Sequence, residues 1–278
     1  MTFLSVIRAL IFPTAVLICE VYMFNIIRAR LQQKHRTMPF PSERTTPVDR
    51  FRGYPHIDIS KCSENCSMCI SSCPVDALQK KENEIRIDLG KCLFCGDCSS
   101  VCSTECITFT NDYQLAARNK NDLIIGDKER VLKAELNKQM KALFGRSLKL
   151  RQVSAGGCNA CEADTNVLNT VGFDLGRFGI QFVASPRHAD GILVTGPVSK
   201  NMKLALEKTY KAVPTPKIVI ATGACAISGG IFRGHEEVCD GVDAVLPVDL
   251  YIPGCPPHPL TILDGLLRML GRISDNKR

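Results

Sequence analysis

Clustered cysteines are the feature of this sequence with the clearest chemical meaning. Nine of the fifteen cysteines fall between Cys62 and Cys106. Thiols packed so closely are more often metal ligands than disulfide partners, and an odd total excludes complete internal pairing. Eight of the nine form an internal repeat, in which three closely spaced cysteines are followed after three residues by a fourth: Cys62, Cys66, Cys69 and Cys73, then Cys92, Cys95, Cys98 and Cys102.

This repeat predicts two [4Fe–4S] clusters. A cubane needs four thiolates around it, and short gaps allow one loop to supply three of them. In two-cluster ferredoxins the fourth cysteine of each run binds the other cluster. The predicted ligands are therefore Cys62, Cys66, Cys69 and Cys102 for the first cluster, and Cys73, Cys92, Cys95 and Cys98 for the second. A pair of zinc sites is the alternative, although zinc sites combine two C-x2-C pairs across a longer loop.

Four further cysteines are dispersed over the C-terminal half. Cys158 and Cys161 follow a Gly-Gly pair, Cys225 follows a Gly-Ala pair, and Cys255 stands within Pro-Gly-Cys-Pro-Pro. Each comes just after a predicted strand, and ligand sites of open α/β sheets gather at the carboxyl ends of strands. The neighbouring glycines allow the backbone to approach a bulky group closely. On spacing alone, C-x2-C after a strand is also typical of a thioredoxin-like redox pair, which would not need the two later cysteines.

Residues 51–110 resemble a bacterial-type double-cubane ferredoxin. The runs Phe51-Arg-Gly53 and Cys92-Leu-Phe-Cys-Gly96 are similar to those of the ferredoxin-like subunits of formate hydrogenlyase and respiratory complex I. Two positions depart from that pattern: the first gap is three residues where two is usual, and Ser103 replaces the proline that usually follows the last ligand. Cys106 stands where the family usually has a small apolar residue, so we expect a packed free thiol there.

Residues 147–278 resemble the small-subunit family shared by [NiFe] hydrogenases and the cluster-bearing subunit of complex I next to its quinone site. The resemblance is carried by Ala184–Asp190, Gly223–Gly230 and Pro247–Pro257. It implies a third [4Fe–4S] cluster with the ligands Cys158, Cys161, Cys225 and Cys255. The complex I version has two adjacent cysteines at the first position, whereas this chain has the hydrogenase-type C-x2-C. That departure favours the energy-converting, membrane-bound [NiFe] hydrogenases of the formate-hydrogenlyase kind.

Several other reactive side chains have two interpretations. Glu162, directly after a proposed ligand, is either a proton relay or a solvated or capping carboxylate at a helix start. Arg187 and His188 are candidates to adjust the potential of the third cluster. The alternative for Arg187 is an ion pair with a carboxylate at a subunit boundary. Cys239 and Cys19 are expected to be packed thiols. The sequence shows no catalytic triad, phosphate loop or paired-carboxylate site, so we expect no substrate turnover by this chain alone.

The elements that position these residues divide the 278-residue chain into five segments. They are a hydrophobic membrane-associated helix (1–36), a linker (37–56), a ferredoxin-like α+β domain with two clusters (57–113), a helical connector (114–146) and a flavodoxin-like α/β domain (147–278). Alternating short apolar strands and helices in the last segment predict a parallel sheet. The predicted strands are Leu148–Val153, Ile180–Ala184, Gly191–Val194, Lys217–Ala221 and Ala244–Val248, and the predicted helices include Val198–Lys211 and Ile262–Leu270.

The apolar run from Leu10 to Ile27 predicts attachment to a membrane, since ~20 such residues span a bilayer. Glu20 is costly in hydrocarbon, so spanning the membrane and docking on membrane subunits are both open. Basic residues follow the run, and by the positive-inside rule they place the bulk of the protein on the cytoplasmic side of the cell membrane. The net charge of +7 suits an anionic membrane surface or an acidic protein partner.

These features predict an electron-transfer subunit of a membrane-bound, energy-converting [NiFe]-hydrogenase-like complex, with three [4Fe–4S] clusters in series. The expected partners are a hydrogenase-type large catalytic subunit, membrane subunits of the same complex, and a ferredoxin or a formate dehydrogenase as electron donor. One alternative is a subunit of a quinone-linked, complex I-like or nickel-free hydrogenase-related complex. Another is a free membrane-tethered ferredoxin. No nucleic-acid partner is expected, because the basic residues form no arrangement that reads bases.

Overall fold

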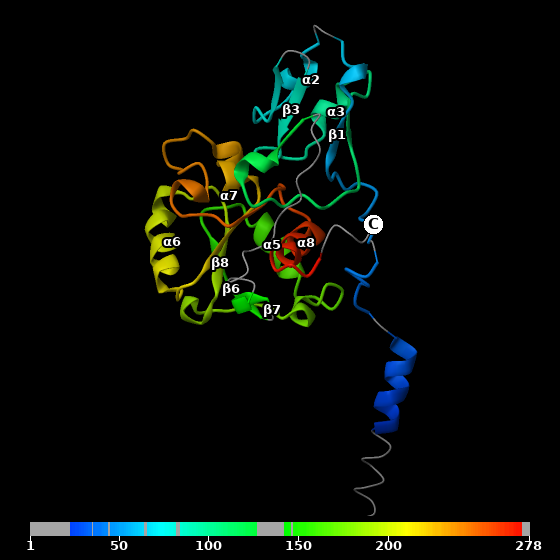
Figure 1. Cartoon of the computed structure of the whole chain (residues 1–278), viewed down its shortest axis with the longest axis vertical. Helices are drawn as coiled ribbons and strands as arrows, with labels where there is room; N and C mark the ends of the chain where they lie inside the picture. Colours follow the sequence, from blue (N-terminus) through cyan, green and yellow to red (C-terminus); the bar gives the residue numbers. More distant parts are fainter. Residues whose placement is uncertain are drawn as a thin grey trace, which may run out of the picture. The chain divides into compact units, whose positions relative to one another are not determined.

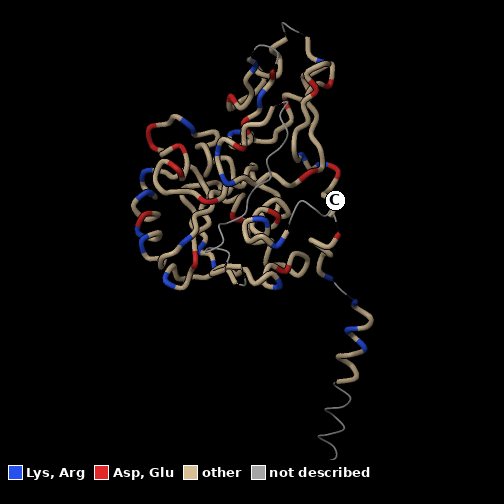
Figure 2. Tube along the Cα trace, viewed as in Figure 1, with Lys and Arg blue, Asp and Glu red and all other residues tan. Residues whose placement is uncertain are grey.

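The computed structural model describes residues 23–34, 36–43, 45–63, 66–81, 84–126, 142–145 and 147–273, and it divides into two compact units, Met1–Pro39 and Phe40–Arg278. In the first unit, residues 23–33 are helical and expose Phe24 and Leu31. The predicted apolar run Leu10–Ile27 lies outside the described residues except for positions 23–27. Within the described part of the chain, no helix is long and apolar enough to cross a bilayer. Figure 2 shows only basic charges on helix 23–33, whereas both signs are interspersed over residues 40–278.

The N-terminal part of the second unit is ferredoxin-like. Its elements are β1 (Pro55–Ile57), α2 (Met68–Ser71), β2 (Leu78–Lys81), β3 (Glu84–Asp88), α3 (Asp97–Ser100), β4 (Ile107–Phe109) and β5 (Ile124–Ile125), with 3-10 helices at Ile59–Lys61 and Lys120–Leu123. β1 pairs with β4, and β3 pairs with both β2 and β5, all antiparallel (Figure 1). Alternation along β3 buries Ile85 and Ile87 on one face.

The C-terminal part is an α/β domain on a five-stranded parallel sheet. Its elements are β6 (Leu148–Ser154), α5 (Ala160–Val167), β7 (Ile180–Phe182), β8 (Gly191–Thr195), α6 (Lys200–Ala212), β9 (Ile218–Thr222), α7 (Ala224–Ser228), β10 (Leu250–Ile252) and α8 (Pro259–Met269), with 3-10 helices at Leu175–Phe178, Pro186–His188, Gly230–Phe232 and Val242–Ala244. The strand order is β10-β9-β8-β6-β7. β8 and β9 are buried at every position, as expected for strands covered on both faces.

Four of the five predicted strands of this sheet are confirmed, but the fifth is wrong. The predicted strand Ala244–Val248 contains Pro247, which has no N–H to donate to a ladder. The chain instead forms a 3-10 turn at Val242–Ala244 and enters the sheet at β10. The predicted helix Val198–Lys211 corresponds to α6, and Ile262–Leu270 corresponds to α8, which starts earlier because His258 caps it. The predicted helical connector 114–146 is wrong for residues 114–126, which form a bridge at Ala117, the 3-10 helix Lys120–Leu123 and strand β5, because they pair with strands of both parts. Residues 142–144 are helical, and 127–141 lie outside the described residues.

The ferredoxin-like part and the α/β part share one apolar core that joins Ile85 and Ile87 to the buried strands of the parallel sheet. Polar contacts reinforce this junction. Ala117 and Tyr251 exchange backbone hydrogen bonds of 3.0 and 2.8 Å, and Ser228 Oγ donates to the Gly90 carbonyl over 2.9 Å. The cysteine-bearing loops of both parts are therefore held on one continuous scaffold.

Candidate metal centres

The structure brings together the four cysteines predicted for the first cluster, called here the first tetrad: Cys62, Cys66, Cys69 and Cys102. All four line one pocket beside Ile85 and Ile107. Cys62 follows the 3-10 helix Ile59–Lys61, Cys69 lies in α2, and Cys102 comes from the other cysteine run, just after α3. The two ends of the repeat thus cross, as the spacing predicts for a two-cluster ferredoxin.

The second tetrad, Cys73, Cys92, Cys95 and Cys98, lines a separate pocket together with Leu93 and Phe109. Two of its thiols are buried, and burial raises the pKa of Cys92 to about 12 and that of Cys98 to about 11. Backbone N–H groups point at the sulfurs: Ala77 N lies 3.3 Å from Cys73 Sγ. Phe94 N lies at the same distance from Cys92 Sγ. Such bonds stabilise the negative charge of a cluster's thiolates.

The third tetrad, Cys158, Cys161, Cys225 and Cys255, forms at the carboxyl edge of the parallel sheet. Its members follow β6, lie in α5 and α7, and follow β10, in that order. Burial is the largest cause that raises the pKa of Cys161. The proximity of Cys225 is next, and Cys255 and Cys158 raise this pKa further. All four thiols therefore lie within electrostatic reach of one another. Cys158 and Cys255 are exposed, so one side of this tetrad is open.

Two glycines leave room beside the sulfurs of the third tetrad. Gly223 has a φ of +94°, and a Cβ there would stand 2.6 Å from Cys161 Sγ. Gly230 has a φ of +58°, and a Cβ there would stand 2.7 Å from Cys225 Sγ. Side chains at either position would enter the space that a cluster next to these thiols needs.

The donor sets fit [4Fe–4S] clusters. Each offers four thiols, the ligand set of a cubane, and these thiols gather around one point of the fold. Among the described residues, no group of three or more His, Cys, Asp or Glu side chains is arranged to hold a metal ion. In a cubane each thiolate binds a different iron atom, so its ligands are spaced more widely than those of a single ion.

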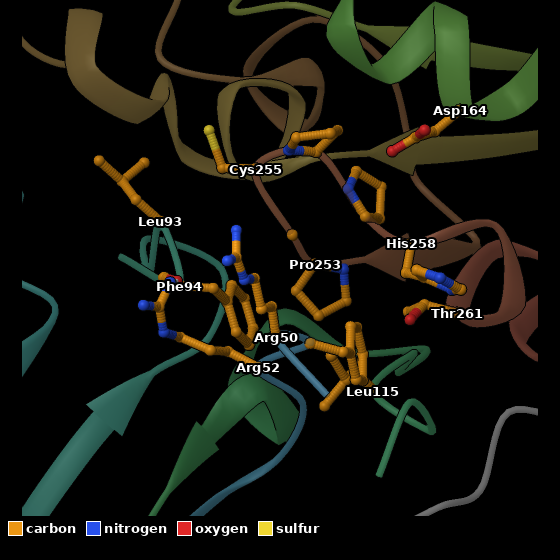
Figure 3. Close-up of a pocket in the computed structure, with 14 residues that line it drawn as sticks. Arg50, Arg52, Leu93, Phe94, Leu115, Asp164, Pro253, Cys255, His258 and Thr261 are labelled. Atoms are coloured by element: carbon orange, nitrogen blue, oxygen red, sulfur yellow. The ribbon is translucent and has the colours of Figure 1, made fainter. Parts of the chain in front are cut away.

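One cavity lies between the second and third tetrads (Figure 3). Leu93 and Phe94, which separate two cysteines of the second tetrad, line it together with Cys255 of the third. Phe51 and His258 close another side with their rings packed edge to face, 5.1 Å between centroids. The second and third tetrads are therefore neighbours in space although Cys255 comes 157 positions after Cys98 in the sequence.

The remaining candidates lie as follows. Glu162 is buried, and its Oε1 accepts a hydrogen bond of 2.6 Å from Thr195 Oγ1, so the interpretation as a solvated carboxylate is wrong. Burial alone would raise its pKa, but hydrogen bonds from Ser154 and Thr195 outweigh it and the pKa is lowered. Cys239 is half-buried and packs against the core, and Cys19 is outside the described residues.

Arg187 and His188 are not brought to the third tetrad. They lie in the 3-10 helix Pro186–His188, which leads into the amino end of β8. The cysteines of the third tetrad lie at the opposite, carboxyl edge of the sheet. The expectation that these two residues adjust the third cluster is therefore wrong for this fold.

Two residues near the first tetrad were missed as neighbours of a cluster. Cys106 lines the first pocket, and burial, followed by the proximity of Cys62, raises its pKa to about 11. Lys80 reaches the same tetrad from β2. The sequence signal for Lys80 was its position two residues after the buried Leu78, which puts both side chains on one face of the strand.

The fifth thiol in the first pocket gives a test of the ligand assignment. Cys102→Ala should lower iron content by about four atoms per chain, because a cubane loses a thiolate ligand. Cys106→Ala should keep the full content, since the backbone N–H that contacts Cys102 Sγ over 3.3 Å remains and only a side-chain hydrogen bond with Cys62 is lost. Iron analysis of the anaerobically purified variants distinguishes the two. Iron loss in Cys106→Ala with retention in Cys102→Ala would exchange the roles of the two cysteines.

Comparison with known proteins gives two family matches. Residues 158–269 match the family described as NADH ubiquinone oxidoreductase, 20 Kd subunit, and residues 54–103 match the 4Fe-4S dicluster domain. The second match supports iron–sulfur clusters in the ferredoxin-like part.

Three curated relatives each match about half of the chain. Formate hydrogenlyase subunit 7 of Escherichia coli is 45% identical over 50% of this chain and 53% of that protein, so the chain spans about half the length of this relative. The "Probable membrane-bound hydrogenase subunit mbhJ" of Pyrococcus furiosus is 40% identical over 49% of this chain and 81% of that protein. One of the NADH-quinone oxidoreductase subunits of Citrifermentans bemidjiense is 45% identical over 44% of this chain and 71% of that protein.

Proposed function

Because the chain belongs to the family of the 20 kDa subunit of NADH:ubiquinone oxidoreductase, we propose that it is an electron-transfer subunit of a membrane-bound, energy-converting [NiFe]-hydrogenase-like complex. Three [4Fe–4S] clusters, one in each tetrad, relay electrons to or from a catalytic large subunit on another chain. The clusters supply the one-electron chemistry. The chain's own residues hold them, limit their contact with water and set their potentials.

The observation that carries this proposal is the succession of the three tetrads along one scaffold. Cys69 of the first tetrad and Cys98 of the second both lie in the shared core and influence each other electrostatically. The second and third tetrads border one cavity through Phe94 and Cys255. A series of closely placed one-electron centres is what a relay requires, and nothing in this arrangement calls for a bound substrate.

The open side of the third tetrad supports a large subunit as the next member of the series. Cys158 and Cys255 are exposed, whereas Cys92 and Cys98 of the second tetrad are buried. A cluster with half its thiols exposed to water would exchange electrons unselectively and react with solvent species. We therefore place the catalytic partner over the loops that carry Cys158 and Cys255.

A complex I-like, quinone-linked assembly is the second candidate, favoured by the 45% identity to a subunit of an NADH-quinone oxidoreductase. The Cys158-x2-Cys161 spacing supports the hydrogenase type. The complex I subunit that residues 147–278 resemble has two adjacent cysteines at this position. The identity to formate hydrogenlyase subunit 7 points the same way.

The electron source distinguishes the two candidates. The complex should be purified anaerobically with its large subunit, and cluster reduction followed by electron paramagnetic resonance. Under H2 we expect reduction of all three clusters in the complex and none in the isolated chain. Reduction by a quinol but not by H2 would establish the complex I-like alternative. A chain that carries all its clusters but associates with no large subunit would be a free electron carrier.

Attachment to the cytoplasmic face of the membrane is part of the proposal and rests on the sequence of the N-terminal segment. Deleting residues 1–30 should release the complex from membranes without loss of iron, because the apolar pattern of residues 40–278 is complete without them. Sedimentation of membranes with immunodetection of the chain measures this. If the truncated complex stays on membranes through its partners, the segment docks on membrane subunits and does not anchor the chain.

A further inference from the structure

The loop of the first tetrad is unusual because its first gap is one residue longer than in the resembled ferredoxins. Cys62 and Cys66 are separated by three residues, where two is usual in the resembled ferredoxins. A lysine from a neighbouring strand reaches this loop. Lys80 Nζ donates to the carbonyl oxygens of Ser63, at 3.1 Å, and Cys66, at 3.2 Å.

The same ammonium also reaches a proposed ligand of the cluster. Lys80 Nζ lies 3.9 Å from Cys62 Sγ in a half-buried environment. Lys80 is fixed there by its strand: in β2 it pairs with Ile85 of β3, and it shares a face with buried Leu78. One side chain thus bridges the carbonyls of Ser63 and Cys66 and places a positive charge beside Cys62 Sγ.

The internal repeat shows that this cation is not a general feature of both clusters. Lys80 comes seven residues after Cys73, and the residue seven positions after Cys102 is Phe109. Phe109 lines the pocket of the second tetrad and packs against Phe94, with ring centroids 6.3 Å apart. Equivalent positions of the two halves therefore carry a cation at the first tetrad and an aromatic ring at the second.

We propose that Lys80 holds the long Cys62–Cys66 loop and raises the reduction potential of the first cluster. A positive charge next to a thiolate ligand stabilises the reduced, more negative form of a [4Fe–4S] cluster, and potentials of such clusters follow local charge and hydrogen bonds to sulfur. The first cluster therefore accepts an electron more readily than it would without this cation. The inference rests on the proposed function only in that the first tetrad holds a cluster.

Lys80→Met removes the charge and the hydrogen-bond donors but keeps an unbranched side chain of similar length. Lys80→Arg keeps a cation. Lys61→Met is the matched control: it removes the same charge next to Cys62 in sequence, but Lys61 Nζ pairs with Asp58 Oδ2, at 3.6 Å. The readout is a redox titration of the full chain followed by electron paramagnetic resonance. The signal of the first cluster is identified by its absence from Cys62→Ser.

In Lys80→Met we expect a lower midpoint potential for the first cluster and unchanged values for the other two, with most of the shift restored in Lys80→Arg. Loss of about four iron atoms from Lys80→Met but not from Lys61→Met would equally support the role in holding the loop. A fully loaded Lys80→Met at the wild-type potential, or an equal effect of Lys61→Met, would overturn the inference. A wild-type chain without the first cluster would instead refute the proposed function.

Discussion

Cys225→Ala is expected to remove the third cluster and to stop electron exchange with the large subunit, while the first two clusters stay in place. Cys225 lies in α7, and its surroundings include Cys255 and Cys158 of the same tetrad. A cubane with three thiolates lacks a ligand for one iron atom. Because the third cluster is the proposed junction between the relay and the large subunit, H2-dependent reduction of the other two clusters should fall to background.

Iron should decrease from about twelve to about eight atoms per chain, since one of three four-iron clusters is lost. Cys239→Ala is the matched control, because Cys239 is a half-buried thiol that packs against the core outside the tetrads. It should keep all the iron and the H2-dependent signals. Full iron content in Cys225→Ala would remove this residue from the ligand set. Loss of all clusters at once would mean that the three sites do not load independently.

Gly223→Ala should also remove the third cluster, although it replaces none of the cluster's ligands. Its Cβ would stand 2.6 Å from Cys161 Sγ, closer than real side-chain contacts allow, and Gly223 has a φ of +94°. The positive φ adds backbone strain of about 1–3 kcal/mol for a residue with a side chain. Either the thiol or the start of α7 must move, so the third cluster should be lost selectively.

Gly172→Ala is the control, because no atom lies within 4 Å of the Cβ it would carry. Absorption and electron paramagnetic resonance spectra of the two variants, together with their iron content, measure the outcome. If Gly223→Ala retains the third cluster with unchanged spectra, the space beside Cys161 Sγ is not needed by a cluster, and the proposed position of that cluster is wrong.

Much of this site could be predicted from residue types and spacing. The repeat of eight cysteines from Cys62 to Cys102 predicted which thiols meet, because in two-cluster ferredoxins the fourth cysteine of each run binds the other cluster. The strands β8 and β9 are nearly continuous apolar runs, which a parallel sheet buried on both faces requires, whereas β6 alternates apolar with polar residues. Cys158, Cys225 and Cys255 then follow strands whose carboxyl ends share an edge.

The predictions that failed concern which segments pair in the sheet and which residues meet in the fold. Both depend on contacts between residues that are far apart in the sequence. Ala244–Val248 has the composition of a strand, but the missing N–H of Pro247 moves the pairing segment to β10. Arg187 and His188 stand in a recognisable motif, yet the sequence did not show that their turn lies at the amino edge of the sheet. Lys80 depends on strand register and on the long gap after Cys62, which only the folded chain brings together.

The central claim is that three separate cysteine tetrads each hold a [4Fe–4S] cluster. The most direct measurement is iron, acid-labile sulfide and zinc analysis of the anaerobically purified full chain, combined with Mössbauer spectroscopy of protein grown on 57Fe. The account predicts about twelve iron and about twelve sulfide per chain, all in cubane-type signals, because three tetrads each bind four of each. About eight iron atoms would contradict the third cluster, and zinc in place of iron would contradict the assignment as a whole.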